Sequence, residues 1–148
     1  MINRVFDEDK AALCDVLLIK LIQDEKKYNL NLDENFVVKD YFKKVIKNEN
    51  NILLSYEVNN EIIAYIFLKQ IICDENKGYL IDGLYVEDNY RNNGIAKVLI
   101  TEALNIIKEK KVSFIDINVM YDNVIARKVY KYFGFNEFKI QLRKVIEA

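Results

Sequence analysis

The chain has 148 residues, of which 51% are hydrophobic and 12% aromatic, enough apolar material for the core of one domain. It contains no histidine and no proline. The absence of histidine excludes Ser-His and Cys-His nucleophile systems and histidine-ligated zinc, so proton transfer must use carboxylates, tyrosines, lysines, thiols or water. The absence of proline leaves no proline-rich linker, and we expect a single domain over residues 1–148.

The charge and the two cysteines narrow the class of protein further. A formal net charge of −1 gives no field that attracts nucleic acid or acidic lipid. The N-terminal sequence MINRVFDEDK is too charged for a signal peptide, and no apolar run approaches membrane-spanning length. Cys14 and Cys73 lack CxxC spacing and nearby ligand types, so we expect two reduced thiols, a cytoplasmic location and no metal site.

The hydrophobic pattern predicts one α/β domain with the element order β-α-α-β-β-β-α-β-α-β. Apolar residues spaced at three and four positions indicate the helices, and β-branched or aromatic runs bounded by Asn-rich turns indicate the strands. In chain order we expect a strand at 2–6, a helix that begins at the acids of 7–9 and has its apolar face over 11–27, and a helix at 36–46. Strands at 52–58, 62–72 and 79–86 follow, then a helix from Gly94 to about Lys111, a strand at 114–120, a helix at 123–133 and a last strand at 135–146.

The segment Val86 to Ala96 carries the sharpest local signal. A strand runs into a turn of Arg91, Asn92, Asn93 and Gly94, and a helix follows. Small residues let a ligand approach the backbone, and the amides of a first helical turn have no partner within the helix, so the turn is a candidate anion site. An ordinary strand-to-helix turn remains open as the alternative.

A second signal lies in the segment from residue 123 to residue 135. Asn123 and Tyr130 are seven residues apart and so share one face of a helix, and Gly134 is suited to its left-handed end. Taken alone, Asn123 is a helix cap and Tyr130 a core aromatic residue.

Together, the two segments resemble the GNAT superfamily, the acyl-CoA-dependent N-acetyltransferases. The family's phosphate loop, Arg/Gln-x-x-Gly-x-Gly/Ala, is matched by Arg91, Gly94 and Ala96. Its later motif, Asn followed seven residues on by Tyr and then by Gly-Phe, is matched from Asn123 to Phe135. The resemblance implies a mixed, mostly antiparallel central sheet flanked by about four helices.

The resemblance also implies roles for particular residues. Backbone groups of Leu84, Tyr85 and Val86 would meet the pantetheine arm of acetyl-CoA, the acetyl donor. Arg91 would shape the loop, and Asn123 would contact the cofactor. Tyr130 would protonate the departing thiolate, since an ordinary tyrosine with a pKa of about 10 holds its proton at neutral pH. The pyrophosphate would bind to the backbone amides of Asn92, Asn93, Gly94, Ile95, Ala96 and Lys97.

The base that takes the proton from the amine is less defined. The resemblance to some polyamine-acetylating members implies that Asp82 is this base and acts through water. The alternative is that Asp82 is only a polar residue on the solvent side of a strand. Ordinary aspartate has a pKa near 3.9 and is a weak base unless burial raises that value. Asp116 is a nearby alternative, and an amine that arrives neutral needs no base.

The expected acceptor is a small primary amine, such as a polyamine or an amino sugar. Asp82 and the acidic residues around the first helix–helix connection (Asp24, Glu25, Asp33 and Glu34) favour a small cation. Acetylation of a protein N-terminus or lysine, and a catalytically silent acyl-CoA-binding regulatory module, stay open. No nucleic-acid or membrane partner is expected, and the oligomeric state is open between a monomer and a homodimer.

Overall fold

Residues 1–25 and 38–147 are described by the computed structural model, and the chain divides into two units, residues 1–118 and 119–148. The first unit contains a five-stranded sheet in the order β1-β2-β3-β4-β5. Its strands are β1 (Ile2–Arg4), β2 (Ile52–Val58), β3 (Glu61–Cys73), β4 (Asn76–Val86) and β5 (Phe114–Ile117). The helices of the chain are α1 (Glu8–Glu25), α2 (Tyr41–Val45), α3 (Ile95–Lys108) and, in the second unit, α4 (Val124–Tyr132), with a 3₁₀ turn at Asp88–Tyr90.

The sheet is mostly antiparallel, as expected. β1 to β4 pair antiparallel with their neighbours, and β5 pairs parallel with β4 after the crossover through α3. Asn59 and Asn60 form the β2–β3 turn with φ of 51° and 64°, and Asp74 and Glu75 form the next turn with φ of 50° and 69°. Both central residues of each hairpin turn thus have positive φ, as the right-handed twist of the strands favours.

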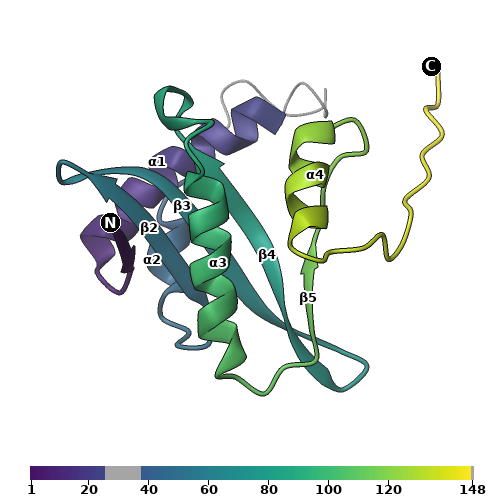
Figure 1. Ribbon diagram of the computed structural model, residues 1–148, viewed down its shortest axis with the longest axis horizontal. Helices are drawn as coiled ribbons and strands as arrows, with labels where there is room; N and C mark the ends of the chain where they lie inside the picture. The colour runs from purple at the N-terminus through teal and green to yellow at the C-terminus, as the bar shows by residue number, and fades with distance from the viewer. Residues whose placement is uncertain (26–37, 148) are drawn as a thin grey trace. The chain divides into compact units, whose positions relative to one another are not determined.

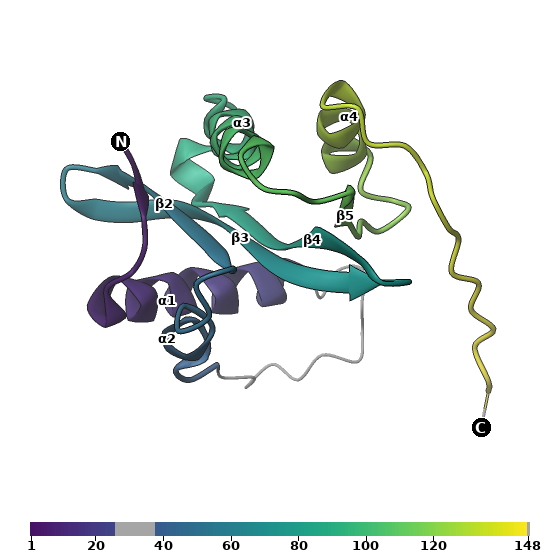
Figure 2. The ribbon, with the colours of Figure 1, turned by 90° about the horizontal axis from the view of Figure 1, so that it is seen from below.

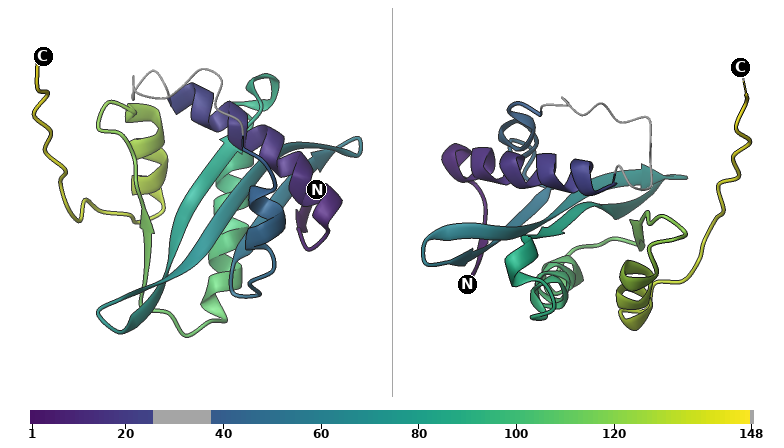
Figure 3. Two further views of the ribbon diagram at one scale, coloured as in Figure 1. Left: turned by 180° about the vertical axis from the view of Figure 1, so that it is seen from behind. Right: turned by 90° about the horizontal axis from the view of Figure 1, so that it is seen from above.

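Helices cover both faces of the sheet. Figure 1 shows α3 lying across β2, β3 and β4. Figures 2 and 3 show α1 and α2 on the opposite face. On that face Phe42 of α2 packs in one buried cluster with Tyr65 and Phe67 of β3 and Leu17 of α1. The side chain of Asp15 joins the two helices, since its Oδ1 accepts the backbone N–H of Phe42 at 3.0 Å.

An irregularity in the β3–β4 ladder is centred on Asp82. Phe67 pairs with Gly83 and the next residue, Leu68, pairs with Ile81, so Asp82 is an extra residue on β4. Such a bulge interrupts the alternation of side chains between the two faces of a sheet. Consequently Asp82 and Gly83 both face the layer of α1 and α2.

The expected last strand does not form. Residues 135–147 have no ladder partner among the described residues, and Phe138, Ile140 and Leu142 of this segment are more than four-fifths exposed. The apolar alternation of 135–146 suits a strand, but a strand also needs a neighbouring edge to supply its hydrogen bonds, and the local pattern carries no information about that neighbour. The prediction of a strand at 135–146 is therefore wrong.

The other expected elements are present, β2 with the expected bounds and most others with ends shifted by a few residues. Helix α1 begins at Glu8, within its expected acidic start, and the side chain of Asp7 accepts the backbone N–H of Asp9 at 2.7 Å. The polar break at 29–35 and the cap at Asp33 lie outside the described residues. None of the described helices is both long and apolar enough to cross a membrane.

Candidate functional site

The loop after β4 has the geometry of an anion site. Gly94 stands at the N-cap of α3 with φ of 77°, and Asn92 also has positive φ at 65°. The first hydrogen bond of α3 runs from the Val98 N–H to the Gly94 carbonyl at 3.0 Å. Because Gly94 has no side chain to cap the first amides of α3, these amides and the positive end of the helix dipole face the space in front of the loop. A Cβ built on Gly94 would meet no atom within 4 Å, so that space is open.

Arg91 holds this loop in place through its side chain. Its Nε donates to the Val86 carbonyl at 2.8 Å, and its guanidinium forms ion pairs at 2.8 Å with Asp24 of α1 and with Asp88. The guanidinium also lies over the ring of Tyr85, 5.2 Å from its centroid. These contacts fasten the loop to Val86 and tie it to the end of α1.

β4 has an open edge between the bulge and the loop. Its parallel ladder with β5 ends at Ile81, opposite Ile117. Beyond that point Leu84, Tyr85 and Val86 pair with β3 on one side, and no described strand pairs with them on the other. Backbone groups at such an edge are available to an extended ligand.

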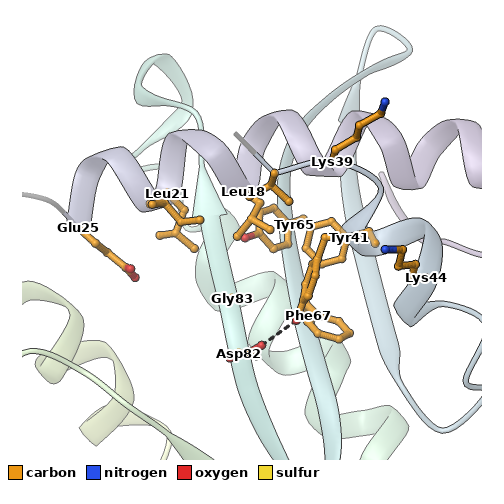
Figure 4. A pocket seen from close by; sticks show the side chains of 13 residues that line it. Leu18, Leu21, Glu25, Lys39, Tyr41, Lys44, Tyr65, Phe67, Asp82 and Gly83 are labelled. Carbon is orange, nitrogen blue, oxygen red and sulfur yellow. Dashed lines mark hydrogen bonds between the residues drawn. The ribbon is translucent and has the colours of Figure 1, made fainter. Parts of the chain in front are cut away.

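A cavity of about 430 Å³ lies between α1, the segment around α2, and the bulged part of β4 (Figure 4). Its apolar and aromatic lining includes Leu18, Leu21, Ile22, Tyr41, Tyr65 and Phe67. Among the residues that the structure describes, its charged lining consists of Glu25, Lys39, Lys44 and Asp82. The rings of Tyr41, Phe42 and Phe67 meet edge to face with centroids 5.2 to 6.1 Å apart. The cavity therefore combines an aromatic wall with a few charged groups.

Two carboxyl groups face this cavity. Asp82 is exposed, and its Oδ2 accepts the hydroxyl of Tyr41 at 3.2 Å. Burial, followed by the charge of Asp82, raises the pKa of Tyr41 to about 12. Partial burial, together with the charges of Asp82 and Asp24, raises the pKa of Glu25 above its ordinary 4.5. A cation placed beside Glu25 and Asp82 would reduce the repulsion between them.

The hydroxyl of Tyr65 is the one buried side-chain polar atom without a hydrogen-bond partner in the described part of the chain. Tyr65 is fully buried, and its Oη lies against Gly83, where an added Cβ would come within 2.8 Å of it. Burial raises the pKa of Tyr65, so the hydroxyl keeps its proton. Gly83 thus provides the space that this hydroxyl occupies.

Of the residues at this cavity, the sequence pattern singled out Asp82, placed Glu25 only in a general acidic region and did not point to Tyr65. Asp24 belonged to the same expected region, yet its carboxylate is engaged by Arg91. Asp33 and Glu34 lie outside the described residues. Asp116 lies on β5 opposite Leu80 and does not line the cavity. Tyr65 carries no local signal, because its importance depends on a glycine in the neighbouring strand.

In the second unit the motif residues form one short helix. Asn123 caps α4, since its side-chain oxygen accepts the N–H of Ala126 at 3.2 Å. Tyr130 lies on α4 with its ring edge-to-face against Phe135, at 6.2 Å between centroids. Gly134 ends the helix with φ of 91°. The cap at Asn123 and the end at Gly134 agree with the sequence-based expectation.

Within residues 1–25 and 38–147 no group of three Cys, Asp or Glu side chains is placed to hold a metal ion. The cysteines are unpaired, with Cys14 buried and Cys73 exposed.

Comparison with known proteins yields one family. The model of the acetyltransferase (GNAT) family matches residues 17–135. The [ribosomal protein bS18]-alanine N-acetyltransferase of Haemophilus ducreyi is 31% identical over 88 residues, which cover 60% of this chain and 58% of that protein. The chain thus matches less than two thirds of the length of this curated relative.

Two solved structures have the same fold. A mutant of the BH1408 protein from Bacillus halodurans superposes with a TM-score of 0.83 at 18% identity, over 99% of each chain. An aminoglycoside N-acetyltransferase in complex with CoA superposes with a TM-score of 0.74 at 14% identity, over 100% of each chain.

Proposed function

Because the chain belongs to the acetyltransferase (GNAT) family, we propose that it transfers the acetyl group of acetyl-CoA directly to a primary amine of a small molecule. One observation carries the proposal: β4 connects the cavity that Glu25 and Asp82 line to the Gly94 loop. Asp82 lines the cavity, and Val86 begins the loop that Arg91 fastens. Four residue-to-residue steps of extended strand lead from Asp82 to Val86, about 13 Å. An acyl donor bound along this strand would have its phosphates at the loop and its thioester near the cavity.

The loop residues fit an acyl-CoA. We assign pyrophosphate binding to the backbone amides from Asn92 to Lys97, supported by the uncapped start of α3 and the open space at Gly94. The open β4 edge at Leu84–Val86 would hydrogen-bond the pantetheine arm, and Asn123 would contact the cofactor from the start of α4.

When bound, acetyl-CoA supplies a thioester whose carbonyl carbon accepts the neutral amine nitrogen, so that the C–N bond forms as the C–S bond breaks. The amine must lose one proton and the thiolate must gain one. We assign the second transfer to the Tyr130 hydroxyl. For the first we retain Asp82 and add Glu25, which lines the same cavity and whose pKa is raised by partial burial and by the charges of Asp82 and Asp24.

The acceptor class follows from the cavity. Two carboxyl groups at a cavity of about 430 Å³ suit a small cationic amine, the class expected from the sequence. Transfer to a protein N-terminus is the second candidate, favoured by the similarity to the ribosomal-protein-alanine N-acetyltransferase.

The test has two stages. Acetyl-CoA at about 100 times its Kd should stabilise the full chain by about 2.7 kcal/mol, measured by thermal or denaturant unfolding. A panel of small amines and of peptides with free N-termini is then assayed for release of the CoA thiol. No stabilisation would contradict the loop assignment, whereas stabilisation without turnover on any acceptor would indicate a silent acyl-CoA-binding module.

The role of Tyr130 has its own control. Tyr130→Phe should lower kcat while leaving acetyl-CoA affinity nearly unchanged, and Tyr132→Phe on the same helix should preserve kcat. An equal kcat in both variants and in the unmodified protein would eliminate Tyr130 as the acid.

A further inference from the structure

The cavity at the bulge of β4 is unusually apolar for a site that would take a polyamine or a sugar. Its wall toward α1 consists of Leu18, Leu21 and Ile22, and Tyr41 and Phe67 form its wall toward α2 and β3 (Figure 4). Leu18, Leu21 and Tyr41 are only partly buried, so each still has apolar surface that a ligand can cover.

The charged groups of the cavity are separated. Figure 4 shows Glu25 at one end of the view and Lys39 and Lys44 at the other, with the Tyr41–Asp82 hydrogen bond between them. An ammonium group is therefore attracted to the end near Glu25 and Asp82. A second ammonium group on the same molecule would extend toward the leucine wall or toward the two lysines, and both positions are unfavourable to a cation.

We propose that this cavity selects a primary monoamine with an aliphatic or aromatic body, its ammonium group beside Glu25 and Asp82 and its body against Leu18, Leu21 and Tyr41. This inference rests on the proposed acetyl transfer. It narrows the acceptor class, and it departs from the polyamine and amino sugar expected from the sequence, because their additional polar groups would have to leave water for an apolar wall.

The apolar surface of the cavity decides which amine is preferred. Each methylene group that enters an apolar pocket changes the ratio of kcat/KM between two substrates by about 10-fold or more, and a substrate that buries a polar group without a partner is rejected more strongly. The described lining offers no polar side chain within the leucine wall to receive a second amino group.

Pentylamine and 1,4-diaminobutane test the proposal, because they differ only in a methyl group replaced by an amino group. The full chain is assayed with acetyl-CoA for thiol release, and binding of each amine is measured separately by calorimetry with CoA present. We expect kcat/KM and affinity to be at least 10-fold higher for pentylamine.

Two variants test whether the leucine wall causes the preference for pentylamine. Leu21→Ser should reduce the ratio between the two amines toward one, while Leu13→Ser, on an exposed position of the same helix outside this cavity, should leave it unchanged. An equal or higher kcat/KM for 1,4-diaminobutane, or a ratio that Leu21→Ser does not change, would overturn the proposal.

The two proposals fail in different ways. Binding of pentylamine with the expected preference, but without any acetylation, would remove the proposed transfer reaction and leave the selectivity of the cavity standing. Acetylation of 1,4-diaminobutane in preference to pentylamine would support the proposed transfer reaction and overturn the proposed selectivity of the cavity.

Discussion

The close approach of Gly83 to the Tyr65 hydroxyl predicts a measurable coupling between the two positions. In Gly83→Ala the new Cβ would stand 2.8 Å from Oη and 3.0 Å from Cε2 of Tyr65. The ring of Tyr65 has little freedom to move, since it is fully buried and packs 5.2 Å from the ring of Phe42. Overpacking of this kind costs about 1–3 kcal/mol of unfolding free energy.

Tyr65→Phe removes the atom with the shortest contact and also removes a buried hydroxyl that has no partner. An unsatisfied buried polar group costs about 1–3 kcal/mol, so Tyr65→Phe should leave the protein at least as stable as before. In the Phe background Gly83→Ala should cost about 1 kcal/mol less than in the Tyr background, and the remaining cost reflects the contact with Cε2.

The assay is urea unfolding of the four proteins of the cycle without ligand, with the midpoints compared at an unchanged m value. Gly94→Ala serves as the control, because its Cβ would meet no atom within 4 Å and its cost arises from φ of 77° alone. That cost should be the same in both backgrounds. Identical costs of Gly83→Ala in both backgrounds, or a loss of more than about 1 kcal/mol in Tyr65→Phe, would refute the reasoning.

Three further predictions concern the loop, the helix pair and the sheet. Arg91→Ala removes a hydrogen bond, two ion pairs and the contact with the Tyr85 ring, all made by a half-exposed side chain. We therefore expect a loss of about 1 kcal/mol in stability, but at least about 10-fold weaker binding of acetyl-CoA by calorimetry. Arg143→Ala, at an exposed position, should change neither quantity. Burial raises the pKa of Asp15, so its contribution to stability is present at low pH and declines as pH rises above 3.8. Asp15→Asn should therefore flatten the decline of the urea midpoint with rising pH. An unchanged dependence of the midpoint on pH would contradict the role of Asp15. Gly78→Ala places a Cβ 2.4 Å from the Phe114 ring and should destabilise the chain by about 1–3 kcal/mol in urea unfolding. In a chain that already carries Phe114→Ala, the cost of Gly78→Ala should be smaller.

Much of the fold was accessible from local patterns. The boundaries of β2 match the expected strand at 52–58, and both β-hairpin turns occur where Asn or acidic residues interrupt the apolar runs. Helix α4 begins after the Asn123 cap and ends before Gly134, as the motif indicated. These features depend on backbone preferences and on hydrogen bonds between residues a few positions apart, which a sequence states directly.

The site was accessible only in part. The turn with Arg91 and Gly94 before α3 could be predicted because the turn and the start of the helix are contiguous in sequence. The ion pair of Arg91 with Asp24, and the place of Glu25 at the same cavity as Asp82, join segments far apart along the chain. The expected strand at 135–146 failed for the same reason, because pairing requires a partner that the local pattern does not name.

The sequence by itself excluded histidine chemistry, and its Arg-x-x-Gly-x-Ala turn before a helix carried the resemblance to the acetyltransferase (GNAT) family. Only the tertiary structure decided what shares the cavity with Asp82. The β4 bulge sets Asp82 and Gly83 on one face, the missing Cβ of Gly83 admits the Tyr65 hydroxyl, and α1 supplies the leucine wall and Glu25. Local preferences act over a few residues, whereas the register of two strands and the packing of a helix on them depend on the whole core at once.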